Sequence, residues 1–407
     1  MSVNAQIVSA GDALETLAAG WEAQARNALT ASWMLHGKPG VGKTQVVTDL
    51  ARQIGAKLFD IRLTTIEPQD LRGLPYYDHS SQRTVWYRPE DLPDDPTSPS
   101  VLFLDELTAA APHLQPTVYG LLQERRVGRH ALPPSVFIVA AGTTVDDGAI
   151  AYEMGTALSD RLIHLQVTAN ATDWLGRYAV DRALAPSVTA FLRARPDLLD
   201  TTEDSLRRGE TIACTPRAWE RVSDIVQAVP DRRMRHTMVA GTVGTAAAAE
   251  FAQVAEEIDA LAKIDELIAA APKDRARLYP KSLNGLVGMI YALVAQARAE
   301  TMPATIEILA DVTSIDAAGL PLGELRAFGF EILIRKAMAA GLAEAFRQSD
   351  AYARYAAETV RAFWQAGRTY LWLNRRKKAI WTDPDRHAYR DAAIMPVSES
   401  GDEELAL

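Results

Sequence analysis

The most informative segment of the chain reads Gly37-Lys38-Pro39-Gly40-Val41-Gly42-Lys43-Thr44. It fills every fixed position of the pattern G-x-x-x-x-G-K-[ST], in which glycines let the backbone aim its N–H groups at phosphate oxygens. A buried-strand pattern at 31–36 precedes the segment, and a helical periodicity at 44–54 follows it and adds its positive N-terminal end. The segment therefore predicts a phosphate-binding loop in which Lys43 reaches the β and γ phosphates and Thr44 ligates Mg²⁺.

A second motif follows further along the chain, where the apolar run 101–104 ends in Asp105 and Glu106. Because the carboxyl ends of parallel strands meet at one edge of a sheet, both carboxylates are expected beside the phosphate loop. We expect Asp105 to hold Mg²⁺ through water, and Glu106 to orient and deprotonate the water that attacks the γ-phosphate. A strand that merely ends at a polar surface is the alternative, and the preceding loop argues against it. The adjacent Asp-Glu pair favours hydrolysis to ADP and phosphate over transfer to a bound acceptor, and the absence of the N/T-K-x-D element of GTPases favours ATP.

Alternating strand and helix patterns define the fold class as α/β. Three more segments have the pattern of strands, namely 57–63, the apolar run 136–141, and 163–167. We predict a domain at 1–170 with a parallel five-stranded sheet and helices on both faces. Its first helix is expected over 12–29, with Asp12 and Glu15 at capping-box spacing. Beyond it we predict an all-α lid at 171–300 and a C-terminal helical extension at 301–407, whose acidic end is expected to fray.

The composition limits the classes of function. The net charge of −9 over 407 residues gives no chain-wide basic field, which argues against nucleic acid as a partner. The single cysteine, Cys214, excludes an internal disulfide. We see neither a signal peptide nor an apolar run of membrane-spanning length, so the sequence predicts a cytoplasmic protein without a membrane span.

Longer stretches of the chain resemble one family. The segments are WMLHGKPGVGKT, EPQDLRGLP, VLFLDELTAAAPHLQPTVYGLLQERRVGRHALPPSVFIVAAG and ALSDRLIHLQV. Across about residues 30 to 240 they are similar to the MoxR branch of AAA+ ATPases. The resemblance implies a homo-oligomer, in the form of a hexameric ring, that uses ATP to remodel partner proteins. It also implies partners that often carry a von Willebrand factor A domain with a metal-ion adhesion site.

The resemblance assigns roles to three more residues. Arg161 matches the arginine that reaches into the neighbouring subunit's site, and Arg217 matches the lid arginine that senses the γ-phosphate. Thr215 and Pro216 fit the start of a helix, which places Arg217 at its front. Thr143 stands where the family usually has the Asn that helps to position the attacking water. Its hydroxyl offers fewer contacts than an amide, which leaves the rate of hydrolysis open.

Plainer readings of these residues stay open. Without the resemblance, Arg161 would be a surface arginine beside an aspartate, and Arg217 a solvated residue at a helix start. His36 and His164 lie in strand-like runs and are predicted to be satisfied core histidines.

The function also has alternatives. One is a nucleotide-gated assembly module with slow hydrolysis, and a weaker one is a DNA-associated motor. The aromatic and basic patch at 364–381 could serve nucleic acid, an acidic partner or helix packing, and we favour packing. The loop 72–75 is a further candidate for partner contact.

Overall fold

The structure is a computed structural model that describes residues 4–143, 159–261 and 264–347, together with Tyr352 and Tyr355. The chain divides into two compact units that alternate along the sequence. The first comprises 1–174, 196–225 and 233–247, and the second comprises 175–195, 226–232 and the residues from 248 on. The boundaries predicted near 170 and 300 followed chain order instead. The predicted patch at 364–381 and the acidic C-terminal end lie outside the described residues.

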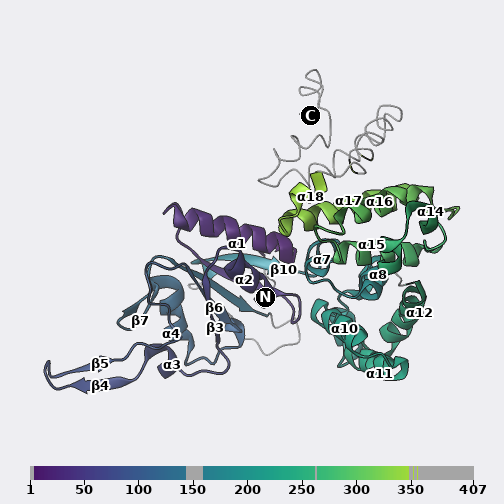
Figure 1. Cartoon of the computed structure of the whole chain (residues 1–407). Coiled ribbons are helices and arrows are strands. Elements are labelled where there is room, and N and C mark those ends of the chain that lie inside the picture. The colour runs from purple at the N-terminus through teal and green to yellow at the C-terminus, as the bar shows by residue number, and fades with distance from the viewer. Residues whose placement is uncertain (1–3, 144–158, 262–263, 348–351, 353–354, 356–407) are drawn as a thin grey trace. The chain divides into compact units, whose positions relative to one another are not determined.

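A six-stranded parallel sheet forms the centre of the first unit (Figure 1). Its order is β1 (Gln6–Val8), β10 (Leu162–Val167), β2 (Ser32–His36), β9 (Val136–Gly142), β6 (Ser100–Asp105) and β3 (Lys57–Arg62). All five predicted strands are confirmed, but the predicted count of five is wrong by one. The sixth strand, β1, has only three residues and one row of partners on β10, so its sequence carries no buried-strand pattern.

Helices cover both faces of this sheet, as the sequence predicts. Two of them, α1 (Ala10–Ala25) and α2 (Lys43–Gln53), pack on one face over side chains such as Leu35 on β2. The other face, which holds Met34, is covered by α3 (Pro68–Arg72), η1 (Leu107–Ala109), α4 (Gln115–Tyr119) and the wide turn η2 (Gly120–Glu124). Alternation of side chains along each strand separates the two apolar layers.

The first helix begins earlier than the sequence pattern predicts. Ser9 is its N-cap, and the Ser9 hydroxyl accepts a hydrogen bond of 3.1 Å from the Asp12 N–H. The predicted cap at Asp12 is therefore wrong by one turn, because a serine at the same spacing is available upstream. The helix ends at Ala25, and Asn27 then takes a left-handed conformation.

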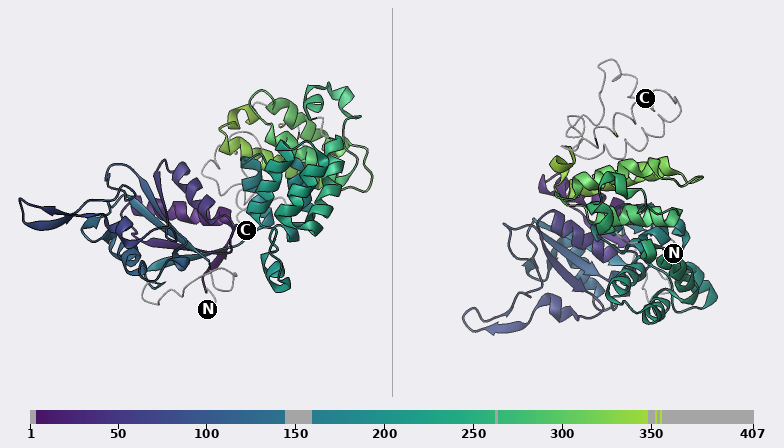
Figure 2. Two further views of the ribbon diagram at one scale, coloured as in Figure 1. Left: turned by 90° about the horizontal axis from the view of Figure 1, so that it is seen from below. Right: turned by 45° about the vertical axis from the view of Figure 1, so that its right-hand side comes forward.

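Two small hairpins, which the sequence analysis did not predict, extend from the sheet. One joins β7 (Arg126–Val127) to β8 (His130–Ala131). The other, which joins β4 (Pro75–Asp78) to β5 (Arg83–Trp86), reaches away from the sheet (Figure 1, Figure 2). Its exposed aromatic side chains belong to Tyr76, Tyr77 and the adjacent Tyr87.

The described residues after the sheet are helical. The helices in the order of the chain are α6 (Ala171–Asp173), η4 (Trp174–Tyr178), α7 (Ala179–Asp181), α8 (Pro186–Ala194), η5 (Pro196–Leu198), α9 (Thr202–Arg208), α10 (Pro216–Ala228), α11 (Arg232–Val243), α12 (Thr245–Leu261), α13 (Ile264–Ala269), α14 (Pro272–Arg275), α15 (Leu283–Ala295), α16 (Met302–Asp311), η6 (Val312–Ser314), α17 (Leu322–Ala339) and α18 (Ala343–Arg347). In the second unit, the apolar α15 packs against α8 and α17, with Tyr291 edge-on to Phe328. Among the described helices, none has the length and apolar character needed to cross a membrane.

Candidate functional site

The loop between β2 and α2 has the backbone that phosphate binding requires. Gly40 and Gly42 both have positive φ, at 80° and 107°, which a residue with a Cβ rarely adopts. Gly42 is also the N-cap of α2, so the first N–H groups of that helix open toward the loop. The loop therefore turns sharply enough to aim its amides at an anion, as the sequence predicts.

Lys43 lies inside the curl of this loop. Its Nζ donates hydrogen bonds to the carbonyl oxygens of Gly37, at 2.6 Å, and Lys38, at 3.0 Å. These two hydrogen bonds hold the ammonium group against the backbone of the loop. A cation and a row of N–H donors in one cradle fit the β and γ phosphates of a nucleotide.

The two residues predicted to hold the metal are brought together. The Thr44 hydroxyl lies 3.3 Å from Asp105 Oδ2 and donates to it, and Asp105 is buried at the end of β6. A hydroxyl and a carboxylate are the oxygen donors that Mg²⁺ takes in such sites. The carboxylate of Asp105 also affects Asp60 on β3. Burial raises the pKa of Asp60 above its usual range, and the negative charge of Asp105 raises it further.

Glu106 follows directly and has a strained backbone. Its φ of 60° and ψ of 35° are left-handed, which is uncommon for a residue with a long side chain. Its carboxylate accepts a hydrogen bond from the Thr64 hydroxyl and lies 3.7 Å from Arg62 Nε. Thr64 follows β3, so the neighbouring strand holds the carboxylate that sequence analysis assigned to water activation.

Thr143 stands at the same edge of the sheet, directly after β9. Its backbone N–H donates to the Thr108 hydroxyl at 3.0 Å. Thr108 also approaches Gly142 so closely that a Cβ there would lie 2.6 Å from the hydroxyl oxygen. Thr108 lies in the short η1 turn after Glu106, so the end of β9 is tied to the segment that carries the predicted base.

Arg217 lies beside the phosphate loop through its backbone, at the start of α10. Thr215 caps α10, because its hydroxyl accepts from the Ala218 N–H at 3.1 Å. The Arg217 N–H then donates to the Gly40 carbonyl at 3.3 Å. A Cβ on Gly40 would lie 3.0 Å from the Thr215 hydroxyl oxygen, so a side chain there would push the helix start away from the loop. The Arg217 side chain is exposed at this point.

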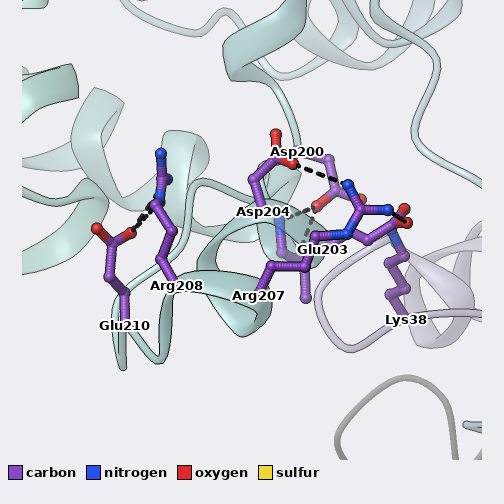
Figure 3. A network of polar contacts seen from close by, with 8 residues as sticks. Lys38, Asp200, Glu203, Asp204, Arg207, Arg208 and Glu210 are labelled. Carbon is purple, nitrogen blue, oxygen red and sulfur yellow. Dashed lines mark hydrogen bonds and ion pairs between the residues drawn. The ribbon is translucent and has the colours of Figure 1, made fainter.

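A second helix, α9, contacts the phosphate loop through an ion pair. Lys38 Nζ lies 3.6 Å from Glu203 on α9, and Arg207 pairs with Glu203 and Asp204 on the same helix (Figure 3). Both side chains of the Lys38–Glu203 pair are partly exposed, so we expect it to add little stability. It does show that the helical segment 196–225 contacts the phosphate loop at two places.

Arg161 lies elsewhere. It precedes β10, and Leu162 pairs with Ser32 whereas Gln166 pairs with His36. At about 3.3 Å per residue, the Arg161 backbone is roughly 15 to 20 Å along the strands from the phosphate loop. The structure therefore does not bring Arg161 to the site of its own chain, and its side chain is exposed.

Three residues of this site were not predicted from the sequence. Thr64, Thr108 and Glu203 contact Glu106, the Thr143 backbone and Lys38, respectively. Strand order could have suggested Thr64, since a polar residue follows the predicted strand 57–63 at the same edge of the sheet. For Thr108 and Glu203 the sequence offers no comparable signal, because short turns and loop packing bring them in.

Comparisons with known proteins agree with this geometry. Residues 32–162 match the family model described as an AAA domain of the dynein-related subfamily. Over these residues the chain is therefore similar to AAA domains, and the parallel sheet with its glycine-rich loop agrees with a nucleotide-binding P-loop fold.

Individual proteins are similar over shorter or more distant stretches. The mouse ATPase family gene 2 protein homolog B is 32% identical over 113 residues, which cover 28% of this chain and 13% of that protein. The human protein of the same name is 32% identical over 116 residues, with the same shares. The chain thus spans a small part of the length of these relatives. Among solved structures, a RuvB mutant of Thermotoga maritima has a TM-score of 0.37 and 16% identity, covering 65% of this chain and 79% of that one.

Proposed function

We propose that the chain hydrolyses ATP and uses the energy to remodel or activate a partner protein, as MoxR-type AAA+ machines do. The contact between Thr44 and Asp105, with Glu106 next in the chain, is the observation that carries the hydrolytic part. It joins the phosphate loop to a pair of carboxylates at one edge of the sheet. A binding module without chemistry would not need the second carboxylate there.

Each residue of the candidate site has a definite role in this proposal. Lys43 and the loop amides bind and orient the phosphates, and Thr44 and Asp105 would hold Mg²⁺. The bound Mg²⁺ supplies positive charge that offsets charge on the phosphate oxygens. Arg217, at the front of α10, adds a guanidinium that can form charge-assisted hydrogen bonds with phosphate.

Glu106 acts as the general base for water. Its carboxylate accepts from the Thr64 hydroxyl through Oε2, which leaves lone pairs on the carboxylate that can receive a proton from water. Arg62 Nε lies 3.7 Å from the other carboxylate oxygen and helps to fix where the carboxylate stands. Arg161 stabilises the transferred phosphoryl group of the neighbouring subunit in a ring. The separation between Arg161 and the loop of its own chain supports this role in trans.

The partner part of the proposal rests on the resemblance to MoxR proteins. It favours a hexameric ring and a partner with a von Willebrand factor A domain. The test uses purified full-length chain and such a partner, with the ATPase rate and the protease sensitivity of the partner as readouts. We expect the partner's digestion pattern to change with ATP, and to stay unchanged with the Glu106→Gln chain. An unchanged pattern with the active chain would contradict remodelling.

A nucleotide-gated assembly module is the second candidate, and Thr143 is the observation that favours it. The residue at this position lacks the amide of Asn, and its backbone N–H is already engaged by Thr108. In this case ATP binding sets the assembly state and turnover is slow. Sedimentation with ATP, ADP and no nucleotide, measured beside the steady-state ATPase rate, separates the two: assembly that follows nucleotide at negligible turnover supports the module.

A further inference from the structure

A series of polar contacts, separate from the phosphate-loop contacts described above, links β2 to β10 and to the residue Ser159 before β10. His36 Nε2 lies 2.8 Å from His164 Nδ1, and the two rings are nearly parallel, at 17°. His164 Nε2 lies 2.9 Å from the Ser159 carbonyl oxygen and 3.1 Å from the Ser159 hydroxyl. His36 is buried, and His164 and Ser159 are partly buried. The prediction that both histidines are satisfied within the fold is confirmed, since each contacts the other.

The partners fix the direction of these hydrogen bonds. A carbonyl oxygen only accepts, so His164 Nε2 must carry a hydrogen that it donates to Ser159. In a neutral ring the Nδ1 of His164 is then an acceptor, which requires His36 Nε2 to donate. The hydrogen bonds therefore run from His36 through His164 to Ser159. A buried polar chain of this kind specifies one arrangement, because each unpaired member would cost free energy.

This series of contacts ends at the phosphate loop on one side and at the segment before Arg161 on the other. His36 is the last residue of β2, and the phosphate loop begins at Gly37. Gly37 also packs against β10, since a Cβ there would lie 2.4 Å from the Val167 carbonyl oxygen. At the other end, Ser159 is two residues before Arg161. Pairing of β10 with β2 begins only at Leu162, so the contact with His164 holds a segment that the strand pairing does not.

We propose that the contact chain His36–His164–Ser159 positions Arg161 for the neighbouring subunit. Through these contacts, the nucleotide state of one subunit's phosphate loop would affect the site of the neighbour, which the Arg161 of that first subunit completes. The inference rests on the proposed role of Arg161 in trans. His36 and His164 are positioning residues in this account, since they act through Ser159 and not on the nucleotide. Nucleotide that shifts the start of the loop would shift His36, and with it the turn that carries the arginine.

Two variants interrupt the contact chain His36–His164–Ser159 at different hydrogen bonds. His164→Asn keeps an acceptor for His36 but cannot reach Ser159, so it leaves His36 paired and the fold intact. His36→Phe removes the donor at the other end, and His36→Gln is the matched rescue because its amide can still donate to His164. For His164→Asn and His36→Phe we expect kcat to fall at least about fivefold, with KM within about twofold and a Hill coefficient for ATP closer to one. His36→Gln should stay near the parent chain.

Mixed rings show on which side of the interface the contact chain acts. An Arg161→Ala chain has an intact base, and a Glu106→Gln chain can lend it an arginine, so their mixture should regain ATPase activity. Adding His164→Asn to the Glu106→Gln chain should lower this activity at least about fivefold, because the arginine is then poorly placed. Adding it to the Arg161→Ala chain should change little.

Each outcome of this experiment decides something. Equal effects of His164→Asn in both chains, or a larger effect in the Arg161→Ala chain, would overturn the inference and leave the trans role standing. If the parent mixture regains nothing, both the inference and the trans role fail. Binding of a fluorescent ADP analogue and the thermal midpoint of each variant, compared with the parent, identify any loss that comes from misfolding.

Discussion

The two edges of the central sheet differ in how many of the candidate site residues they bring together. At the carboxyl edge, the phosphate loop, Asp105 and Glu106 lie together, and they are tied by hydrogen bonds to β3 and to the start of α10. At the amino edge, Arg161 stands in an exposed turn before β10, several residues of strand away from the loop. In our proposal, one chain holds the groups for nucleotide binding and water activation. The arginine, in our account, serves another copy.

The largest effect is expected from the centre of the carboxyl edge. Lys43→Ala removes the ammonium group that the Gly37 and Lys38 carbonyls hold in the loop. We expect nucleotide affinity to fall at least about 100-fold, as for loss of one member of a buried charge pair. Fluorescent ATP-analogue titration measures it, with Lys281→Ala as a control at an exposed lysine. Binding within tenfold of the parent would show that the loop is not the phosphate site.

Glu106→Gln tests the water-activating residue at the same edge. The amide cannot take a proton from water, so we expect kcat to drop by about 10²- to 10⁴-fold while nucleotide binding is kept. Phosphate release and nucleotide titration on the same sample provide both numbers. Glu90→Gln changes an exposed glutamate and should leave both as they are. Normal turnover by the Glu106→Gln chain would remove Glu106 from the mechanism.

A smaller effect is expected at the helix start that touches the loop. Arg217→Ala deletes an exposed guanidinium whose own backbone N–H already bonds to Gly40. One charge-assisted hydrogen bond, partly screened by solvent, corresponds to a loss of about tenfold in kcat/KM. Arg221→Ala, one turn further along α10, is the matched control. Equal kinetics for the two variants would count against a sensing role for Arg217.

The smallest effect concerns Thr143. If its hydroxyl positions water less well than an amide, Thr143→Asn should raise kcat by about two- to fivefold, since one more neutral hydrogen bond contributes that much. Thr143→Ala should lower it. Steady-state phosphate release measures both. A rate unchanged in both variants would show that this residue does not limit turnover, and would weaken the case for a slow nucleotide-gated module.

Much of the carboxyl edge could be predicted from the sequence. Buried parallel strands are continuous apolar runs, and the glycines of the loop are dictated by backbone conformations that other residues avoid. Thr215 and Pro216 predicted the helix start that places Arg217. Each of these signals is local, so one sequence is enough to show it.

The contacts between strands could not be predicted in the same way. The pairing of His36 with His164 and of Thr64 with Glu106 depends on strand order and register, which no local pattern encodes. The strand β1 was missed for a related reason: three residues with one neighbouring strand carry no periodicity. The roles of Arg161 and Thr143 came from the resemblance alone and stay predictions.

The most direct test of the difference between the two edges is the mixture of Arg161→Ala and Glu106→Gln chains. Each is expected to be nearly inactive alone, because every site then lacks either the arginine or the base. Mixed in equal amounts before assembly, they form some interfaces where an intact Glu106 meets an intact Arg161. We predict that ATPase activity reappears in the mixture, at a fraction of the parent rate. A mixture no more active than its components would contradict the account of a site completed by a second copy of the chain.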